Sequence, residues 1–424
     1  MLAGLAVCAG IAALYLSGSL TFIDRPLTSA RFKLVTTDPT DDVVVVEIDA
    51  PSLRQIAVWP WPRSTHATVI DKLREAGARQ IAIDIDFSAT STPDEDDALA
   101  AALARTDRNV IPPVFEQGSQ SAVTSTAPLP QFAAHTRIAS ANIRPDSDGI
   151  VRRLARVELW SGALVPSMAP AAAGLEPTEM GRYYVDFGIA ADKIKTVSYF
   201  KVLQGDYDPS MFAGKIVLVG ASALELGDTV PTPVGGVMPG VMVQALATES
   251  LLQDRDLRKV SRWLILAVAC ILFFLIEGIC RKRGWRHGVA AGAGALIAIV
   301  GLPLVVQANL PLMIETAPWL AAVTAAFLSA LVTKLRDLDL RLIGQAILLR
   351  RTDALMRQVV ENSSDGLLVI DDQGKVRSIN PAAERIFGQP ATEIVRQHFF
   401  DVIPTTSHQP PIHSLSRMAY ADRP

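Results

Sequence analysis

Four apolar segments constrain this 424-residue chain most, because each approaches or reaches the roughly 20 residues that cross a bilayer as a helix. They lie at residues 2–23, 263–280, 288–307 and 314–333. Half of all residues are apolar and 20% are charged, which excludes a disordered chain. We therefore predict four transmembrane helices in contact with the lipid bilayer: an anchor at 1–23 and three more helices within 263–333.

The charges of the short loops predict the orientation. Basic residues crowd the hairpin at 281–286, whereas the connection around Asn309 carries none, so the hairpin is expected in the cytoplasm. Residues 24–262 are then extracytoplasmic, and the chain from Lys334 onward is cytoplasmic. We predict a multi-pass inner-membrane protein. A cleaved signal peptide is the alternative interpretation of residues 2–16, although no basic residue precedes that run.

Charge and cysteine content exclude several other classes. The net charge is −3, and no stretch concentrates Lys and Arg among aromatic residues, so no nucleic-acid partner is expected. The three cysteines, Cys8, Cys270 and Cys280, all fall in apolar runs. They predict neither a disulfide framework nor a Cys-x-x-Cys metal site, and we assign no metal ligands.

The long segment between the first two spans has an α/β pattern. Residues 43–49 and 81–87 are β-branched runs of strand length, and residues 64–78 between them have helical spacing. A third buried strand is expected at 215–220, followed by a helix at 239–252. This order predicts an α/β domain with a mainly parallel sheet.

Acidic residues end two of these strands. Glu47 and Asp49 share one face of the first strand, Asp84 and Asp86 share one face of the second, and Asp228 follows the third. Open α/β sheets bind ligands at the carboxyl ends of their strands. These carboxylates therefore predict a site for a polar ligand or a divalent cation.

A structural role for the same carboxylates is the alternative. Asp49 with Ser52 could cap a following helix, and Asp84 and Asp86 could accept hydrogen bonds from backbone amides in turns.

The segment Trp-Pro-Trp-Pro-Arg at 59–63 holds two indoles rigidly just before a helix, because proline fixes φ and keeps the preceding residue extended. We include Trp59, Trp61 and Arg63 in the predicted ligand site. An apolar lid on the edge of the sheet is the alternative.

Several of these elements, in their order, resemble the type-two CHASE sensor domain over residues 24–254. The matching segments are 43–49, 59–64, 77–87, 146–149 with Arg152 and Arg153, 215–222, Asp228, 232–233 and 239–241. The resemblance implies the extracytoplasmic input module of a bacterial receptor, which senses an unknown small ligand. It also implies that three consecutive spans follow the module.

Residues 334–360 continue the last span with apolar residues at heptad spacing. The seam contains Leu335, Leu338, Leu342, Leu349 and Met356, with the polar residues Gln345 and Thr352 within it. We expect a coiled-coil signalling helix that pairs with a second copy in a homodimer. An amphipathic helix lying on the inner leaflet is the alternative.

Residues 361–424 begin with a hairpin signal and then a helix start at Asn380-Pro381 and a helix end at Phe387-Gly388. This part resembles the opening of a PAS domain, which implies an α+β fold. The expected module is incomplete, because 402–424 has no strand pattern. Its cofactor is unknown, and the lack of a cysteine beyond Cys280 excludes flavin–cysteine photochemistry.

No motif of a cyclic-dinucleotide enzyme or of a kinase occurs in the sequence. We therefore predict a signal-transduction receptor that relays a stimulus to a cytoplasmic effector domain or protein. A longer form could carry a cyclic-di-GMP cyclase or phosphodiesterase, or a histidine kinase. The alternative is a membrane-anchored extracytoplasmic enzyme or binding protein that uses Asp49, Asp84 and Asp86.

The orientation is testable by labelling single cysteines in a cysteine-free variant with an impermeant maleimide. A cysteine at Ser119 is expected to react in intact cells, whereas one at Ser378 is expected to react only after lysis. The opposite pattern would reverse the topology.

Overall fold

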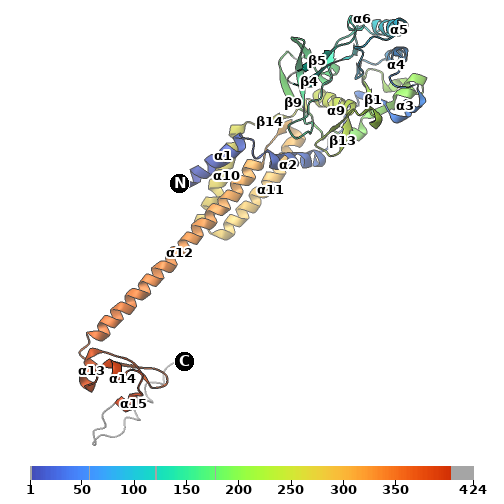
Figure 1. Cartoon of the computed structure of the whole chain (residues 1–424). Coiled ribbons are helices and arrows are strands. Elements are labelled where there is room, and N and C mark those ends of the chain that lie inside the picture. Colours follow the sequence, from blue (N-terminus) through green and yellow to red (C-terminus); the bar gives the residue numbers. More distant parts are fainter. Residues whose placement is uncertain (1, 57, 120–121, 177, 403–424) are drawn as a thin grey trace. The chain divides into compact units, whose positions relative to one another are not determined.

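The computed structural model describes residues 2–402 except 57, 120–121 and 177. Within that range it does not describe the side chains of 117–119, 122–124, 337–347, 349–351, 353–354 and 357. The chain forms two compact units, Met1–Ala330 and Leu331–Pro424 (Figure 1).

A five-stranded sheet organises the first unit. Its strands, in spatial order, are β10 (Lys195–Ser198), β1 (Val43–Ile48), β11 (Ile216–Ala221), β2 (Gln80–Ile83) and β3 (Val110–Ile111). Every neighbouring pair is parallel, which confirms the predicted parallel sheet. Strand β11 lies between β1 and β2, so the chain that connects those two strands crosses over it.

Helices cover both faces of this sheet. Val45 of β1 packs in one hydrophobic cluster, whereas Val44 and Val46 pack in another, as the alternation of side chains along a strand requires. The first cluster includes α7 (Met168–Ala172) and α9 (Gly240–Leu252); the second includes α4 (Arg63–Glu75), α5 (Pro93–Ala104) and α8 (Tyr199–Gln204). With both faces buried, a ligand can reach the sheet only at its edges.

Two further three-stranded sheets complete the α/β domain, and the sequence pattern did not indicate them. One contains β4 (Pro113–Ser119), β5 (Ala122–Thr126) and β6 (Ala139–Ser140); the other contains β7 (Arg153–Trp160), β8 (Ala163–Pro166) and β9 (Gly181–Tyr184). The smaller elements are α3 (Ala50–Gln55), α6 (Pro130–Ala133), β12 (Thr229–Pro231), β13 (Val237–Pro239) and the 3-10 turns Ala191–Lys193, Pro209–Met211 and Leu224–Leu226.

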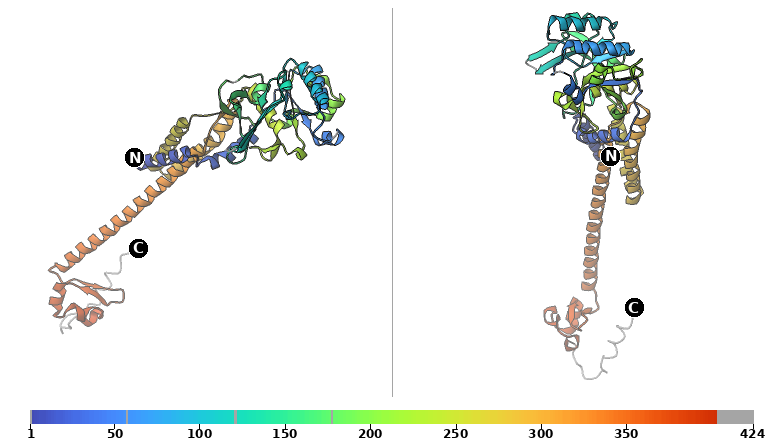
Figure 2. Two further views of the ribbon diagram at one scale, coloured as in Figure 1. Left: turned by 45° about the horizontal axis from the view of Figure 1, so that its top comes forward. Right: turned by 90° about the vertical axis from the view of Figure 1, so that its right-hand side faces the viewer.

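Three helices are long and apolar enough to cross a membrane. They are α10 (Arg262–Lys282), α11 (Trp285–Asn309) and the Ala317–Arg336 part of α12 (Ala317–Glu361). In all the views α10 and α11 run side by side (Figures 1 and 2). These helices confirm the three spans that were predicted after the α/β domain.

The first predicted span, residues 1–23, is not one helix. It consists of α1 (Leu2–Leu16) and the start of α2 (Thr21–Leu34), and the two helices are bent by 68° relative to each other. Only together are they long and apolar enough to cross a membrane. The break coincides with Gly18, whose φ of 79° is left-handed and ends a helix readily. Helix α2 also carries charged residues, among them Asp24 and Arg31, which are buried.

A set of polar contacts, here named the joint, connects the α/β domain to the start of α12. The short strand β14 (Arg258–Lys259) pairs with β15 (Leu312–Met313), and Lys259 forms an ion pair with Glu315. The Asp24 carboxylate accepts hydrogen bonds from the amides of Thr316 (2.7 Å) and Ala317 (2.9 Å). The first turn of α12 is thereby capped by a residue almost 300 positions earlier in the chain.

In the second unit, α12 continues without a break to Glu361. Of the predicted seam, Leu335, Thr352 and Met356 are exposed. The side chains of the other four seam residues, Leu338, Leu342, Gln345 and Leu349, lie outside the described residues.

The segment after α12 has the local structure that its sequence predicts. Strands β16 (Leu368–Ile370) and β17 (Val376–Ile379) form an antiparallel hairpin, and α13 (Pro381–Phe387), α14 (Ala391–Ile394) and α15 (Phe399–Val402) follow. The Asn380 side chain caps α13 by accepting a hydrogen bond from the Ala383 amide, and Gly388 ends the helix with a φ of 68°.

Candidate functional site

A cavity of about 510 Å³ lies at the carboxyl ends of β2 and β11. Its lining residues are Trp59, Asp84, Phe115, Glu116, Ala141, Asn142, Ile143, Arg144, Ala221, Leu226, Asp228 and Val230. The structure therefore brings together three of the eight predicted ligand-site residues: Trp59, Asp84 and Asp228. We refer to this space as the edge cavity.

Asp84 directly continues β2, and its amide donates to the carbonyl of Val219 at 2.7 Å. Its carboxylate is half-buried and accepts no hydrogen bond from any residue that the structure describes. The neighbouring Gly220 is required here, since a Cβ at that position would lie 2.8 Å from the Cβ of Val241 and 3.3 Å from that of Asp84. Burial, and secondarily the charge of Asp228, raise the pKa of Asp84 to about 7.

Asp228 lies beside the start of α9. The Gly240 amide donates to the main-chain carbonyl of Asp228 at 3.1 Å, and a Cβ at position 240 would lie only 2.6 Å from a carboxylate oxygen of Asp228. Glycine at 240 thus lets the carboxylate approach the amino end of the helix, where the helix dipole favours a negative charge. Burial raises the pKa of Asp228.

The opposite wall contains polar residues that were not predicted. Arg144 lies 3.6 Å from a carboxylate oxygen of Glu116 and 3.5 Å from one of Glu158, while Asn142 donates to Glu158 at 2.9 Å. The pairing of β4 with β6 brings these residues to the cavity. The alternation of Ser140, Asn142 and Arg144 is the one sequence signal that indicates a polar face here.

Three of the predicted carboxylates lie elsewhere. Asp49 caps α3 by accepting from the Ser52 amide at 2.8 Å, as the capping alternative predicts. Asp86 is exposed and accepts from the Ser88 amide at 2.8 Å, which is the turn interaction of the same alternative. Glu47 is half-buried, and burial and then the charge of Asp49 raise its pKa.

Trp61 and Arg63 are packing residues of the domain interior. Trp61 is buried, with ring centroids 4.9 Å from Tyr199 and 5.0 Å from Trp59. Arg63 is buried too, and its guanidinium forms an ion pair with Asp96. Of the Trp-Pro-Trp-Pro-Arg segment, only Trp59 lines the edge cavity.

The lining of the edge cavity is mostly polar. The walls carry three carboxylates, Asp84, Glu116 and Asp228, and one guanidinium, Arg144, beside the aromatic ring of Trp59. No group of three or more His, Cys, Asp or Glu side chains with the geometry of a metal site occurs among the described residues.

Comparison with known families identifies the class of the protein. The model of the CHASE2 domain matches residues 3–279, which is more than half of the chain, so the chain belongs to the CHASE2 family. The model of the PAS fold matches residues 354–423. A CHASE2 domain, three apolar helices after its main body and a C-terminal PAS segment define a membrane sensor.

One curated relative supports the signalling class. The chain is 29% identical over 139 residues to the signal transduction histidine-protein kinase AtoS of Escherichia coli (strain K12). The match covers 31% of this chain and 23% of the relative, so the chain spans about a quarter of that protein. No solved structure matches the chain.

The raised pKa of Asp84 predicts a pH-dependent stability. In the unfolded chain the carboxyl group loses its proton near its ordinary pKa of 3.8, but in the folded domain it keeps the proton to about pH 7. Stability contributed by this group is therefore complete at low pH and is lost as the pH rises from about 4 to about 7. The variant Asp84→Asn removes this dependence.

Melting temperatures of the detergent-solubilised full chain at pH 5 and pH 8 test this prediction. We expect the melting temperature of the unmodified chain to fall more from pH 5 to pH 8 than the melting temperature of Asp84→Asn. Asp86→Asn is the matched control, because Asp86 is exposed, and it should behave like the unmodified chain. Equal falls for all three proteins would contradict the assignment.

Proposed function

We propose that this chain is a transmembrane receptor whose CHASE2 domain binds a small extracytoplasmic ligand in the edge cavity. One observation carries the proposal: two carboxylates with raised pKa values, Asp84 and Asp228, line a cavity at the carboxyl edge of a parallel sheet. Perturbed titratable groups in a concave site are typical of binding sites. The boundaries we propose are 1–23, 24–262, 263–333, 334–360 and 361–424, with the second segment outside the inner membrane and the last two in the cytoplasm.

The ligand we propose is a small molecule with a positive charge or several hydrogen-bond donors. The Asp84 carboxylate accepts no hydrogen bond from the described residues, so such a ligand would supply the missing donors. Arg144 repels a positively charged ligand only weakly, because Glu116 and Glu158 lie within 4 Å of its guanidinium and compensate its charge. The half-buried ring of Trp59 adds a surface on which a cation or an apolar group can pack.

The relay that we propose runs through the joint into α12. This helix begins at Ala317, directly after the residues that Asp24 and Lys259 hold, and it continues for 45 residues through the membrane segment. Pairing of two copies along the seam at 335–356 would allow two arrangements of the cytoplasmic helices. A ligand acts on such a pair by binding one arrangement more tightly than the other.

The output we propose is a histidine kinase, on the same chain or on a partner, because the relative in E. coli is a histidine-protein kinase. A cyclic-di-GMP enzyme is the second candidate for the output. The extracytoplasmic enzyme that was the alternative function is less well supported, since Asp49 and Asp86 are engaged in a helix cap and a turn and do not line the edge cavity with Asp84.

Ligand binding can be tested on the full chain by thermal shift with a panel of small amines and amino acids. A compound that binds is expected to raise the melting temperature of the unmodified protein and of Asp86→Asn, but not that of Asp84→Asn/Asp228→Asn. The same compound should change the yield of disulfide crosslinking between single cysteines at Leu342 or Leu349. Equal stabilisation of the double variant would place the ligand elsewhere, and an unchanged crosslinking yield would contradict the relay.

A further inference from the structure

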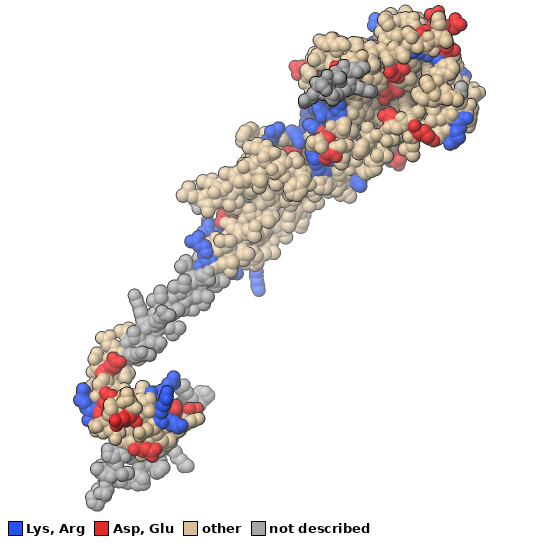
Figure 3. All heavy atoms as spheres, viewed as in Figure 1, with Lys and Arg blue, Asp and Glu red and all other residues tan. Residues whose placement is uncertain are grey.

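A second cavity lies where the CHASE2 domain meets the start of α10. It has a volume of about 600 Å³, and its lining is strongly basic. Of the described residues, six basic side chains line it, namely Arg153, Arg156, Arg182, Arg258, Lys259 and Arg262, with one carboxylate, Asp256. We call this space the basic cavity. In Figure 3 blue side chains, with red ones among them, gather at the domain boundary, next to a membrane segment whose middle part has almost no charged surface.

Carboxylates compensate only part of this charge. Arg156 and Arg258 share one oxygen of Asp256, from which Arg258 lies 3.4 Å away. Lys259 forms its ion pair with Glu315, which precedes the start of α12. Arg156 and Arg258 therefore share a single carboxylate, and Lys259 pairs with a carboxylate on the other side of the joint.

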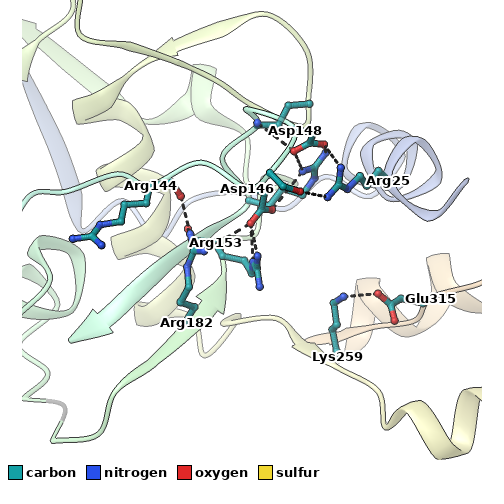
Figure 4. A network of polar contacts seen from close by, with 11 residues as sticks. Arg25, Arg144, Asp146, Asp148, Arg153, Arg182, Lys259 and Glu315 are labelled. Atoms are coloured by element: carbon teal, nitrogen blue, oxygen red, sulfur yellow. Dashed lines mark hydrogen bonds and ion pairs between the residues drawn. The ribbon is translucent and has the colours of Figure 1, made fainter. Parts of the chain in front are cut away.

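A second carboxylate is shared even more widely (Figure 4). Asp146 accepts a hydrogen bond from Arg153 at 3.0 Å, lies 3.4 Å from Arg152 and lies 3.9 Å from Arg182. Arg182 donates its hydrogen bonds to the main-chain carbonyls of Arg144 and Arg153 instead. A net positive charge therefore remains on this side of the domain.

Two groups have capacity left for a ligand. Arg262 is exposed and, in the described part of the chain, forms no hydrogen bond or ion pair. The Tyr183 side chain is only 3% exposed and lines the basic cavity, yet its hydroxyl has no hydrogen-bond partner among the described residues. A buried hydroxyl without a partner is unfavourable, so an acceptor in the cavity would stabilise the folded domain.

We propose that the basic cavity binds a phosphate group, and specifically the phosphate of an anionic phospholipid headgroup. Phosphate oxygens are acceptors that match the forked donors of arginine, and the Tyr183 hydroxyl offers one more donor. The position favours a lipid as the source. Arg262 is the first residue of the membrane helix α10, and the next residue, Trp263, is 73% exposed, as is typical of tryptophan at the headgroup level.

A bound headgroup would contact both the CHASE2 domain and the membrane helix α10. Arg153 and Tyr183 come from β7 and β9 of the domain, Lys259 comes from β14, and Arg262 begins α10. The lipid would thus connect the CHASE2 domain to the membrane helices in addition to the joint. The fraction of anionic lipid would then change how firmly the domain is held to these helices. This role is separate from the edge cavity, since no residue lines both spaces.

Binding can be measured on the full chain in detergent with three probes: a short-chain phosphatidylglycerol, the matching phosphatidylcholine and inorganic phosphate. The test variant is Arg258→Gln/Arg262→Gln. The control is Arg54→Gln/Arg79→Gln, which removes the same charge from two exposed arginines outside the basic cavity. Tyr183→Phe serves as a third variant that leaves every charge in place.

We expect phosphatidylglycerol to bind the unmodified chain and the control at least tenfold more tightly than phosphatidylcholine. The test variant should lose about thirtyfold in affinity for phosphatidylglycerol, because it removes two interfacial arginines that together contribute on the order of 2 kcal/mol. Tyr183→Phe should lose about fivefold, the value of one hydrogen bond.

Competition identifies the source of the phosphate. If millimolar inorganic phosphate does not displace phosphatidylglycerol, the site is a headgroup site. If it does so in the unmodified chain but not in the test variant, the phosphate site stands and its ligand is soluble. Equal affinity of the test and control variants, an unchanged affinity of Tyr183→Phe, or equal binding of the two lipids would overturn the proposal.

Discussion

The structure depends on the joint, which holds the end of the CHASE2 domain against the segment that enters α12. The Lys259–Glu315 ion pair and the pairing of β14 with β15 connect the end of the CHASE2 domain to the segment that enters α12. Asp24 adds hydrogen bonds to the first amides of the same helix. Asp24 is buried, so a displacement of α12 away from it would leave its carboxylate without its two amide donors.

In the proposed relay, α9 connects the edge cavity to the membrane helix α11. The helix starts at Gly240 beside Asp228 and ends at Leu252. Three residues later, Arg255 contacts the Asp186 carboxylate and donates to the Gln307 carbonyl of α11 at 2.9 Å. A shift of the start of α9 on ligand binding would therefore be transmitted to the membrane helix α11.

The sequence predicted those elements whose pattern is local. The β-branched run at 43–49 forms β1, and Asn380-Pro381 starts α13, because strand alternation and helix capping involve only neighbouring residues. The composition of the edge cavity could be predicted only in part. Asp84 and Asp228 follow buried strands and are recognisable, but Arg144 reaches the cavity through the pairing of β4 with β6, which no local signal specifies. The same holds for the joint, where Asp24 meets α12.

Hydrogen exchange at the joint tests the central claim, which is that the CHASE2 domain and α12 are coupled there. Charge reversal at Lys259→Glu should raise exchange of the amides at 312–320, and Glu315→Lys should raise exchange of those of Arg258 and Val260 across β14 and β15. Coupling is reciprocal, so the double reversal Lys259→Glu/Glu315→Lys should restore protection on both sides. Single reversals that affect only their own segment, or a double reversal that exchanges as fast as the single ones, would contradict the account.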